Sequence, residues 1–391
     1  MIKLSDEFEK YLLRTYRRYN VVFIRGNDKY LFDINGKKYL DFFSGLSVCN
    51  LGHCDKKLVQ ILKKQAENLW HCSNLFYNPL QLKIAKELVK KSFPAKVFFS
   101  NSGAEANECA IKIARKYGSN SSRYEIITFK NSFHGRTIET LTATGQNKFH
   151  KGYEPLLDGF KYAEFNNINS VKKLLNKRTI AIMLEPIQGE GGVIPAEKNF
   201  LKEIRDLCDD KDLILIFDEI QTGFGRTGKF FAYQYYEVKP DIITLAKSIA
   251  NGIPLGATII DNKYAGVFNY GDHGSTFGGN LISCAVAIEV IKKIDDKLLK
   301  NVEVVGKYFH DKLSELKNKY NFIISVRGVG LMLGIELKFH AREIVEECLK
   351  NGVIINVTQE KVIRFLPPLN ITKSDVNYVI DVLDKIFKKY S

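Results

Sequence analysis

The stretch LILIFDEIQTGFGRTG, residues 213–228, gives the clearest indication of the fold. Its opening run is continuously apolar, which is typical of a strand buried on both faces of a parallel sheet. Two carboxylates, Asp218 and Glu219, follow at the end of that run. Burying an ionised carboxylate is costly unless it is paired, so Asp218 at the carboxyl end of a central strand indicates a cationic partner. A helix cap or a surface acid is the ordinary alternative, and this stretch alone leaves both interpretations open.

The next apolar run downstream, IITL at residues 242–245, ends beside Lys247. The separation from Asp218 suits one strand–helix–strand step, which would bring both side chains to the same edge of a sheet. A lysine desolvated there has a lowered pKa and can attack an aldehyde. Lysines that merely end a strand are common, so the spacing suggests this chemistry without establishing it.

Short apolar runs alternate with helical stretches from about residue 55 to residue 290. The other runs are VFFS at 97–100, EIITF at 125–129 and AIMLEP at 181–186. Runs of this kind separated by helices predict an α/β domain with a mostly parallel sheet flanked by helices.

Two glycine-containing turns are candidates for phosphate binding. In FFSNSGAEAN, residues 98–107, a strand passes through small residues into a helix, and Gly103 leaves room for close approach to its unpaired N–H groups. In HGSTFGGN, residues 273–280, Ser275 and Thr276 offer hydroxyls in a glycine-rich loop. An ordinary turn is the alternative at both places.

Outside this region the pattern changes. Residues 21–42 alternate apolar and polar around Asn35-Gly36, which predicts a β-hairpin with a type I′ turn. After residue 290 we expect a helix over 302–320, a second from about residue 341 and several strands, which together indicate a smaller α+β domain. A chain of 391 residues exceeds what one core usually supports. We therefore expect an N-terminal segment (1–55) that is part of the small domain, a large domain (56–290) and a C-terminal small domain (291–391).

Composition excludes several classes of protein. The formal net charge of +14 comes from lysines spread over helix faces rather than from one basic tail, so we expect no nucleic-acid partner. The N-terminus lacks the features of a secretory signal, and no apolar span would cross a bilayer, so we expect a cytoplasmic protein. The 7 cysteines form no CxxC pair. His53-Cys54 and His71-Cys72 fit no common zinc spacing, so no metal is expected.

The pattern GxGxxG occurs at residues 223–228, after a strand, and raises the alternative of a nucleotide-binding oxidoreductase. No helix is expected at its last glycine, because the aromatic-rich KFFAYQYY follows. No acidic residue ends a second strand about 20 residues onward. We therefore interpret this stretch as one that shapes a loop.

Over nearly its whole length the sequence resembles the class III (subgroup II) aminotransferases, which depend on pyridoxal phosphate (PLP) and have fold type I. The matching stretches are LGHCDKKLV, LWHCSNLFYN, FFSNSGAEANECAIKIARKY, FKNSFHGRT, LEPIQGEGGVIPA, LIFDEIQTGFGRTG, PDIITLAKSIANGIPLGA, HGSTFGGN and VIRFLPPLNIT. A PLP-binding protein without catalysis is the rival class. A protein of that class would usually have lost one of the residues that catalysis needs. This sequence keeps all four of them, Lys247, Asp218, Arg136 and Arg364.

The resemblance implies a role for each of several residues toward the cofactor. Those implied are Lys247 as the Schiff-base lysine, Asp218 on the pyridine nitrogen, Gln221 near the phenolic oxygen, Phe133 stacked on the ring, Gly103 and Ala104 on the phosphate, and Thr276 on the phosphate of the partner subunit's cofactor. The role of Thr276 implies a homodimer with shared active sites.

The resemblance also implies the substrates. Arg136, with Ser275 nearby, would bind the α-carboxylate of N2-acetylornithine, and Arg364 would bind that of 2-oxoglutarate. Glu190 would pair with Arg364 while the donor reacts. The expected reaction is a step of arginine biosynthesis. Ornithine, succinyldiaminopimelate and 4-aminobutyrate remain alternative donors, because a few loop residues decide the preference.

Overall fold

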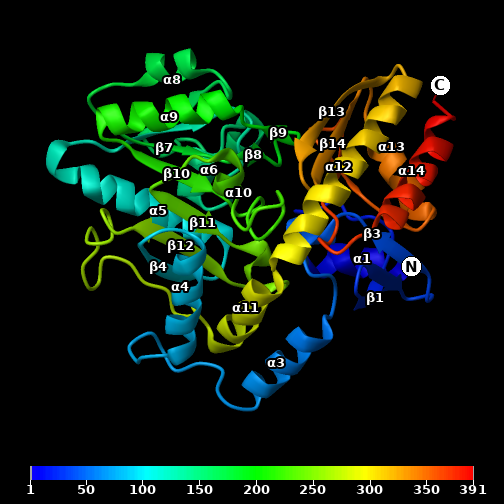
Figure 1. Cartoon of the computed structure of the whole chain (residues 1–391), viewed down its shortest axis with the longest axis horizontal. Helices are drawn as coiled ribbons and strands as arrows, with labels where there is room; N and C mark the ends of the chain where they lie inside the picture. The colour runs from blue at the N-terminus through cyan, green and yellow to red at the C-terminus, as the bar shows by residue number, and fades with distance from the viewer. Residues whose placement is uncertain (1, 391) are drawn as a thin grey trace.

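The computed structural model describes residues 2–390 and is built around one seven-stranded and two four-stranded sheets (Figure 1). The seven strands, in spatial order, are β4 (Ala95–Ser100), β12 (Gly256–Asp261), β11 (Ile242–Leu245), β10 (Ile214–Asp218), β7 (Thr179–Leu184), β5 (Glu125–Phe129) and β6 (Phe160–Ala163). Only β12 runs antiparallel to its neighbours within this sheet, while the other paired strands are parallel. The predicted mostly parallel α/β sheet is confirmed.

Helices cover both faces of this sheet, which explains why its strands are apolar throughout. Successive side chains of a strand point to opposite faces. Along β10, Ile214 and Ile216 pack with α5 (Gly103–Gly118), whereas Leu215 and Phe217 join the core on the other face. That second core is covered by α4 (Pro79–Lys91), α9 (Lys198–Lys211) and α11 (Leu281–Lys293), with α3 (Lys56–Ala66) packed on α11.

Shorter elements connect these helices and strands. They are α2 (Ser44–Ser47), η1 (Ser119–Ser121), α6 (Ile138–Ala143), α7 (Asn147–His150), α8 (Ile168–Leu174), α10 (Ala232–Tyr236) and η2 (Lys247–Ala250). A small hairpin of β8 (Ile187–Gln188) and β9 (Ile194–Pro195) carries the loop between them to the edge of the C-terminal sheet, where Arg327 Nε donates to Gly192 O over 2.9 Å.

The C-terminal part is a four-stranded antiparallel sheet with three helices packed on it (Figure 1). Its strands are β13 (Ile323–Val329), β14 (Met332–Leu337), β17 (Val362–Phe365) and β16 (Asn356–Thr358), and its helices are α12 (Asp296–Lys319), α13 (Arg342–Lys350) and α14 (Lys373–Phe387). Helix α12 begins earlier than the sequence predicted, because the Asp295 side chain caps it by accepting the Leu298 N–H.

The N-terminal part begins with α1 (Ile2–Tyr11) and forms a second four-stranded sheet, with strands β1 (Phe23–Asn27), β2 (Tyr30–Asp33), β3 (Lys38–Asp41) and β15 (Val353–Ile354). Because β3 pairs with β15, Leu40 and Phe42 join the apolar core of the C-terminal helices.

The hairpin predicted around Asn35-Gly36 is present between β2 and β3, but the predicted type I′ turn is wrong. Only Gly36 is left-handed, with φ of 81°. Asp33 Oδ1 accepts the N–H groups of Asn35 and Lys37 and so closes a longer loop. The division of the chain at residues 55 and 290 stays a prediction.

Among residues 2–390, no helix combines the length and the apolar character needed to span a bilayer.

Candidate active site

A cavity of about 400 Å³ opens where the parallel strands of the seven-stranded sheet end. In an open α/β sheet, ligands bind at this edge. The cavity is lined by loops that follow β4, β5, β7, β10 and β11. The predicted site residues in its lining are Gly103, Ala104, Phe133, Arg136, Glu190, Asp218, Gln221 and Lys247. Residues far apart in the sequence therefore meet in one cavity.

Lys247 lies at the start of η2, directly beyond the end of β11. Its φ of 50° is left-handed, a backbone conformation that costs a residue with a side chain on the order of 1 to 3 kcal/mol and that clusters at functional sites. Burial lowers the pKa of the Lys247 amine, and the nearby Arg364 adds to the effect, while Glu190 and Asp218 oppose it. The amine is therefore closer to its neutral, nucleophilic form than an exposed lysine.

Asp218 ends β10 and is held in place by three donors. Its Oδ2 accepts Asn107 Nδ2 and His134 Nδ1, each over 2.8 Å, and its Oδ1 accepts the Ile220 N–H over 3.1 Å. Asn107 also donates to His134 O, which orients the imidazole. The carboxylate is 4% exposed and faces the cavity, so a cationic ring nitrogen in the cavity would meet a fixed negative charge.

Glu219 points away from the cavity although it follows Asp218 directly. Its carboxylate accepts the N–H groups of Ala232 and Tyr233 at the start of α10. Burial raises the pKa of the Glu219 carboxyl to about 8. Of the two adjacent acids, one lines the cavity and the other is a helix cap.

The start of α5 forms one wall of the cavity. Ser102 caps the helix by accepting the Glu105 N–H over 3.2 Å, and the first N–H groups of an α-helix have no partner within the helix. A Cβ at Gly103 would lie 2.7 Å from Ile220 Cδ1, so a side chain here would have to displace that of Ile220 in the loop after β10. This wall offers N–H groups and the positive end of a helix dipole to an anion.

Phe133 and Arg136 occupy the loop after β5. The Phe133 N–H donates to Glu185 Oε1 over 2.9 Å, and the Phe133 ring lines the cavity. The Arg136 guanidinium carbon lies 4.0 Å from the centre of the Phe149 ring, in a cation–π contact. An aromatic face and a guanidinium are thus presented to the same space.

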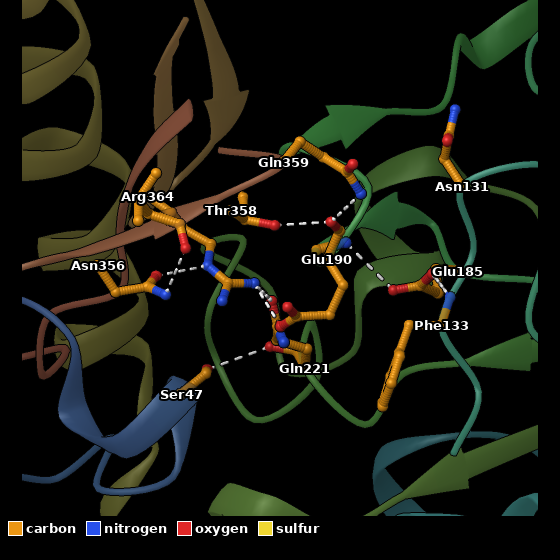
Figure 2. Close-up of polar contacts among 12 residues, drawn as sticks. Ser47, Asn131, Phe133, Glu185, Glu190, Gln221, Asn356, Thr358, Gln359 and Arg364 are labelled. Atoms are coloured by element: carbon orange, nitrogen blue, oxygen red, sulfur yellow. Dashed lines mark hydrogen bonds and ion pairs between the residues drawn. The ribbon is translucent and has the colours of Figure 1, made fainter. Parts of the chain in front are cut away.

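Arg364, on β17, is not part of the cavity lining but contacts two residues that are, Glu190 and Gln221 (Figure 2). It is fully buried, and its Nη1 lies 2.7 Å from Glu190 Oε1 and 3.3 Å from Gln221 Oε1. Its Nη2 has no partner within residues 2–390. Burial raises the pKa of the Glu190 carboxyl, but Arg364, Lys247 and Gln221 together outweigh burial and lower it overall. The guanidinium therefore has one nitrogen paired with a carboxylate and a second that is buried and unpaired, so a ligand could contact it only by displacing Glu190.

Ser275 and Thr276 lie outside the cavity lining. Ser275 Oγ accepts a hydrogen bond from Asn101 Nδ2 over 3.2 Å. Because Asn101 lines the cavity, Ser275 contacts the lining without being part of it. Thr276 lines a separate crevice together with His71 and Gln81. A single chain does not bring Thr276 to its own cavity.

Glu185 lines the cavity and was not among the predicted site residues. Its Oε1 accepts the Phe133 N–H and its Oε2 accepts the Gly189 N–H, so it links two cavity loops (Figure 2). Burial raises the pKa of the Glu185 carboxyl to about 7. A carboxylate that follows the buried strand β7 is the same signal that marked Asp218, and it could have identified this residue.

Comparison with known proteins agrees with this geometry. Residues 11–387 match the family described as aminotransferase class-III. The acetylornithine aminotransferase of Methanocaldococcus jannaschii is 50% identical over 387 residues, covering 98% of this chain and 97% of that protein. Among solved structures, the ornithine aminotransferase of Toxoplasma gondii superposes with a TM-score of 0.95 at 32% identity, covering 99% and 96% of the two chains. The N-acetylornithine aminotransferase of Stenotrophomonas maltophilia superposes with a TM-score of 0.85 at 37% identity, covering 100% and 99%.

The fold and the cavity define a PLP-dependent transferase of fold type I. Within that class, the chain belongs to the class III aminotransferases, and it is an enzyme that uses PLP. The cavity fits the cofactor, because it combines a lysine amine, a fixed carboxylate, an aromatic face and a helix start that offers N–H groups at Gly103. The resemblance deduced from the sequence is confirmed.

Proposed function

We propose that this enzyme transfers the δ-amino group of N2-acetyl-L-ornithine to 2-oxoglutarate, giving N-acetyl-L-glutamate 5-semialdehyde and L-glutamate in arginine biosynthesis. The observation that carries the proposal is a cavity lined by Arg136 and by Glu190, which pairs with the buried Arg364. Within residues 2–390, Arg136 makes no ion pair with a carboxylate, so one guanidinium is available to a ligand and the other is held by Glu190. Relatives that are 42 to 50% identical over nearly the full chain and bear the name acetylornithine aminotransferase support the choice of donor.

The cavity residues hold the cofactor and move protons beside it. When bound, PLP carries the amino group between the substrates and withdraws electrons from the reacting carbon. Lys247 Nζ would hold the cofactor covalently and, once released from it, would move a proton at the substrate carbon. Asp218, oriented by His134 and Asn107, keeps the ring nitrogen protonated. Phe133 would stack on the ring face, Gln221 would lie near the phenolic oxygen, and the N–H groups of Gly103 and Ala104 would hold the phosphate.

Two unlike substrates then share the site. Arg136 binds the α-carboxylate of the donor, near Ser275, while Glu190 neutralises Arg364. When 2-oxoglutarate enters, its distal carboxylate takes the place at Arg136. Its α-carboxylate displaces Glu190 from Arg364, and the buried, unpaired Nη2 then completes a bidentate contact.

We further propose that the enzyme is a homodimer in which Thr276 contacts the phosphate in the partner's active site. Support comes from the apolar side chains around Thr276. Leu75, Tyr77 and Phe277 are 90%, 106% and 59% exposed, and a second copy of the chain would cover them. Co-expression of Lys247→Ala chains with Thr276→Glu chains tests this. Mixed dimers should regain about one intact site in two, and activity no higher than that of the Thr276→Glu enzyme alone would refute it.

We also propose that the enzyme is cytoplasmic. The domain division at residues 55 and 290 is likewise a proposal. An enzyme free in solution would pass its products directly to the next step. Limited proteolysis tests the division, since cleavage should concentrate near the two boundaries.

The donor is tested by mixing the PLP enzyme separately with N2-acetylornithine, ornithine, succinyldiaminopimelate and 4-aminobutyrate in a stopped-flow absorbance instrument. We expect N2-acetylornithine to convert the cofactor fastest by a wide margin. The strong superposition on the Toxoplasma gondii ornithine aminotransferase favours ornithine as the second candidate. If ornithine reacts fastest, the class of enzyme stands and the donor assignment is wrong.

A further inference from the structure

Three residues from one end of the C-terminal sheet contact both members of the Glu190–Arg364 pair (Figure 2). Asn356 and Thr358 belong to β16, and Gln359 follows directly. Thr358 and Gln359 contact the backbone of Glu190, and Asn356 contacts the guanidinium of Arg364. One short segment thus holds the backbone of Glu190 and the guanidinium of Arg364, which come from different parts of the chain.

The backbone of Glu190 is tied to this segment by two hydrogen bonds. Glu190 O accepts Thr358 Oγ1 over 2.6 Å and Gln359 Nε2 over 2.8 Å. Gln359 has a left-handed φ of 47°, which turns the chain at this point. Thr358 is only 6% exposed, so its hydroxyl is shielded from competing water.

The loop around Glu190 is also held on either side. The Gly189 N–H donates to Glu185 Oε2 over 3.1 Å, and Gly192 O accepts Arg327 Nε over 2.9 Å. A Cβ at Gly189 would lie 2.0 Å from Gln221 Oε1, so the loop is packed against its neighbours. With the backbone held at three places, the Glu190 carboxylate can leave Arg364 only by rotation of its own side chain.

The guanidinium plane of Arg364 has its own support. Asn356 Oδ1 accepts Arg364 Nε over 2.9 Å, on the opposite side from Glu190. This bond fixes the guanidinium plane, and with it the direction in which Nη1 faces Glu190 and Gln221. Without it, a buried N–H would lose its acceptor and the plane could turn away from a ligand.

We propose that Asn356, Thr358 and Gln359 are positioning residues that set the choice between a substrate with one carboxylate and a substrate with two. Thr358 and Gln359 hold Glu190 where it competes with a ligand for Arg364, and Asn356 holds Arg364 where the ligand can use it. The inference rests on the proposed function and deepens it.

The two contacts have opposite effects on a ligand with two carboxylates. Removing the hydrogen bonds to Glu190 O weakens the hold of the Glu190 carboxylate on Arg364, so a ligand with two carboxylates binds more tightly. Releasing the guanidinium plane weakens the receptor, so the same ligand binds less tightly. A ligand that uses Arg136 alone is indifferent to both changes. A purely structural role of the segment would instead weaken every ligand together.

The test is isothermal titration calorimetry of the holoenzyme with two unreactive probes. Glutarate carries two carboxylates, and N2-acetyl-L-norvaline keeps the acetylated end of the donor without its amine. The variants are T358V/Q359N, in which asparagine tolerates the left-handed backbone but is too short to reach Glu190, and N356L. Thr358→Ser keeps the hydroxyl and is the matched control.

We expect glutarate to bind about fivefold more tightly to T358V/Q359N and about tenfold more weakly to N356L, the scale of one or two hydrogen bonds. N2-Acetyl-L-norvaline should bind every variant within about twofold of the parent enzyme, and Thr358→Ser should match the parent. Parallel changes for both probes, or glutarate shifts of the same sign in both variants, would overturn the inference. If the double variant does not fold, Thr358→Val alone should give about a twofold tighter glutarate complex, and an unchanged or weaker complex overturns the inference equally.

The outcome is separable from that of the proposed function. Glutarate reports on Arg364 whichever amine the enzyme prefers. Failure of N2-acetyl-L-norvaline to bind the parent enzyme would count against the donor assignment, and the opposite shifts of glutarate would still support the positioning residues.

Discussion

Replacing Glu190 by glutamine tests the contribution of the negative charge that pairs with Arg364. The substitution keeps the length of the side chain and an oxygen within reach of Arg364 Nη1, which lies 2.7 Å from Glu190 Oε1. It also leaves the backbone bonds to Thr358 and Gln359 in place. The change therefore removes one negative charge and little else.

The size of the effect follows from the geometry of the pair. Coulomb's law with an effective dielectric constant of about 20 gives a gross attraction of about 6 kcal/mol at this separation. Arg364 is fully buried but the Glu190 side chain is 28% exposed, so solvent and the cost of desolvation offset most of that attraction. With the hydrogen bond of the amide retained, a net difference of about 1.4 kcal/mol, or about tenfold, remains.

We expect the two half-reactions to change in opposite directions. Without the competing carboxylate, the KM for 2-oxoglutarate should fall about tenfold. With Arg364 left uncompensated beside the donor, kcat/KM for N2-acetylornithine should fall by a similar factor. The ratio of the two specificity constants should therefore shift about a hundredfold toward the keto acid.

Single-turnover absorbance measurements of each half-reaction check this prediction. Glu360→Gln is the matched control, because Glu360 directly follows the same segment and its side chain is 74% exposed. Equal losses in both half-reactions of Glu190→Gln, or the same shift in Glu360→Gln, would refute the reasoning. Because Arg364 lowers the pKa of Glu190, the discrimination of the parent enzyme should not vary between about pH 6 and pH 9.

Three further changes test the site and its support. Lys247→Ala should abolish turnover and the visible absorbance of the lysine-linked cofactor, and normal turnover would contradict its role. Asp218→Ala should cost several orders of magnitude in kcat while retaining part of the PLP, as measured by cofactor content after dialysis. Glu219→Gln should lower Tm at pH 6 by removing one capping acceptor. The pKa of Glu219 is raised to about 8, so the native state holds its proton more tightly than the unfolded chain and stability falls as pH rises from about 4.5 to about 8. The Tm difference between the parent and Glu219→Gln should therefore shrink toward pH 9, and a growing difference would show that burial does not hold this carboxyl protonated.

Local patterns were enough to predict much of the molecule. Asp218 and Lys247 each follow an apolar run, and parallel neighbouring strands end at the same edge of a sheet, so their proximity followed from the order of the elements. The glycine turn before α5 was also visible locally, because small residues between an apolar run and a helical pattern mark where the helix begins.

Other features depended on contacts that no local pattern encodes. The separation of Asp218 from Glu219 depends on where α10 begins, and the loop at Asn35 depends on a bond from Asp33. The position of Thr276 outside its own cavity was likewise invisible in the sequence without the family resemblance.

The sequence by itself determined the parallel sheet and the residues at its strand ends, because hydrophobic periodicity and strand direction act between near neighbours in the chain. Only the tertiary structure decided how Glu190 and Arg364 are held. Their supports, Asn356 and Thr358, are polar residues in a short edge strand, with no periodicity that marks them. Their role arises only when the C-terminal sheet packs against the loop between β8 and β9, and such long-range packing is a property of the folded chain as a whole.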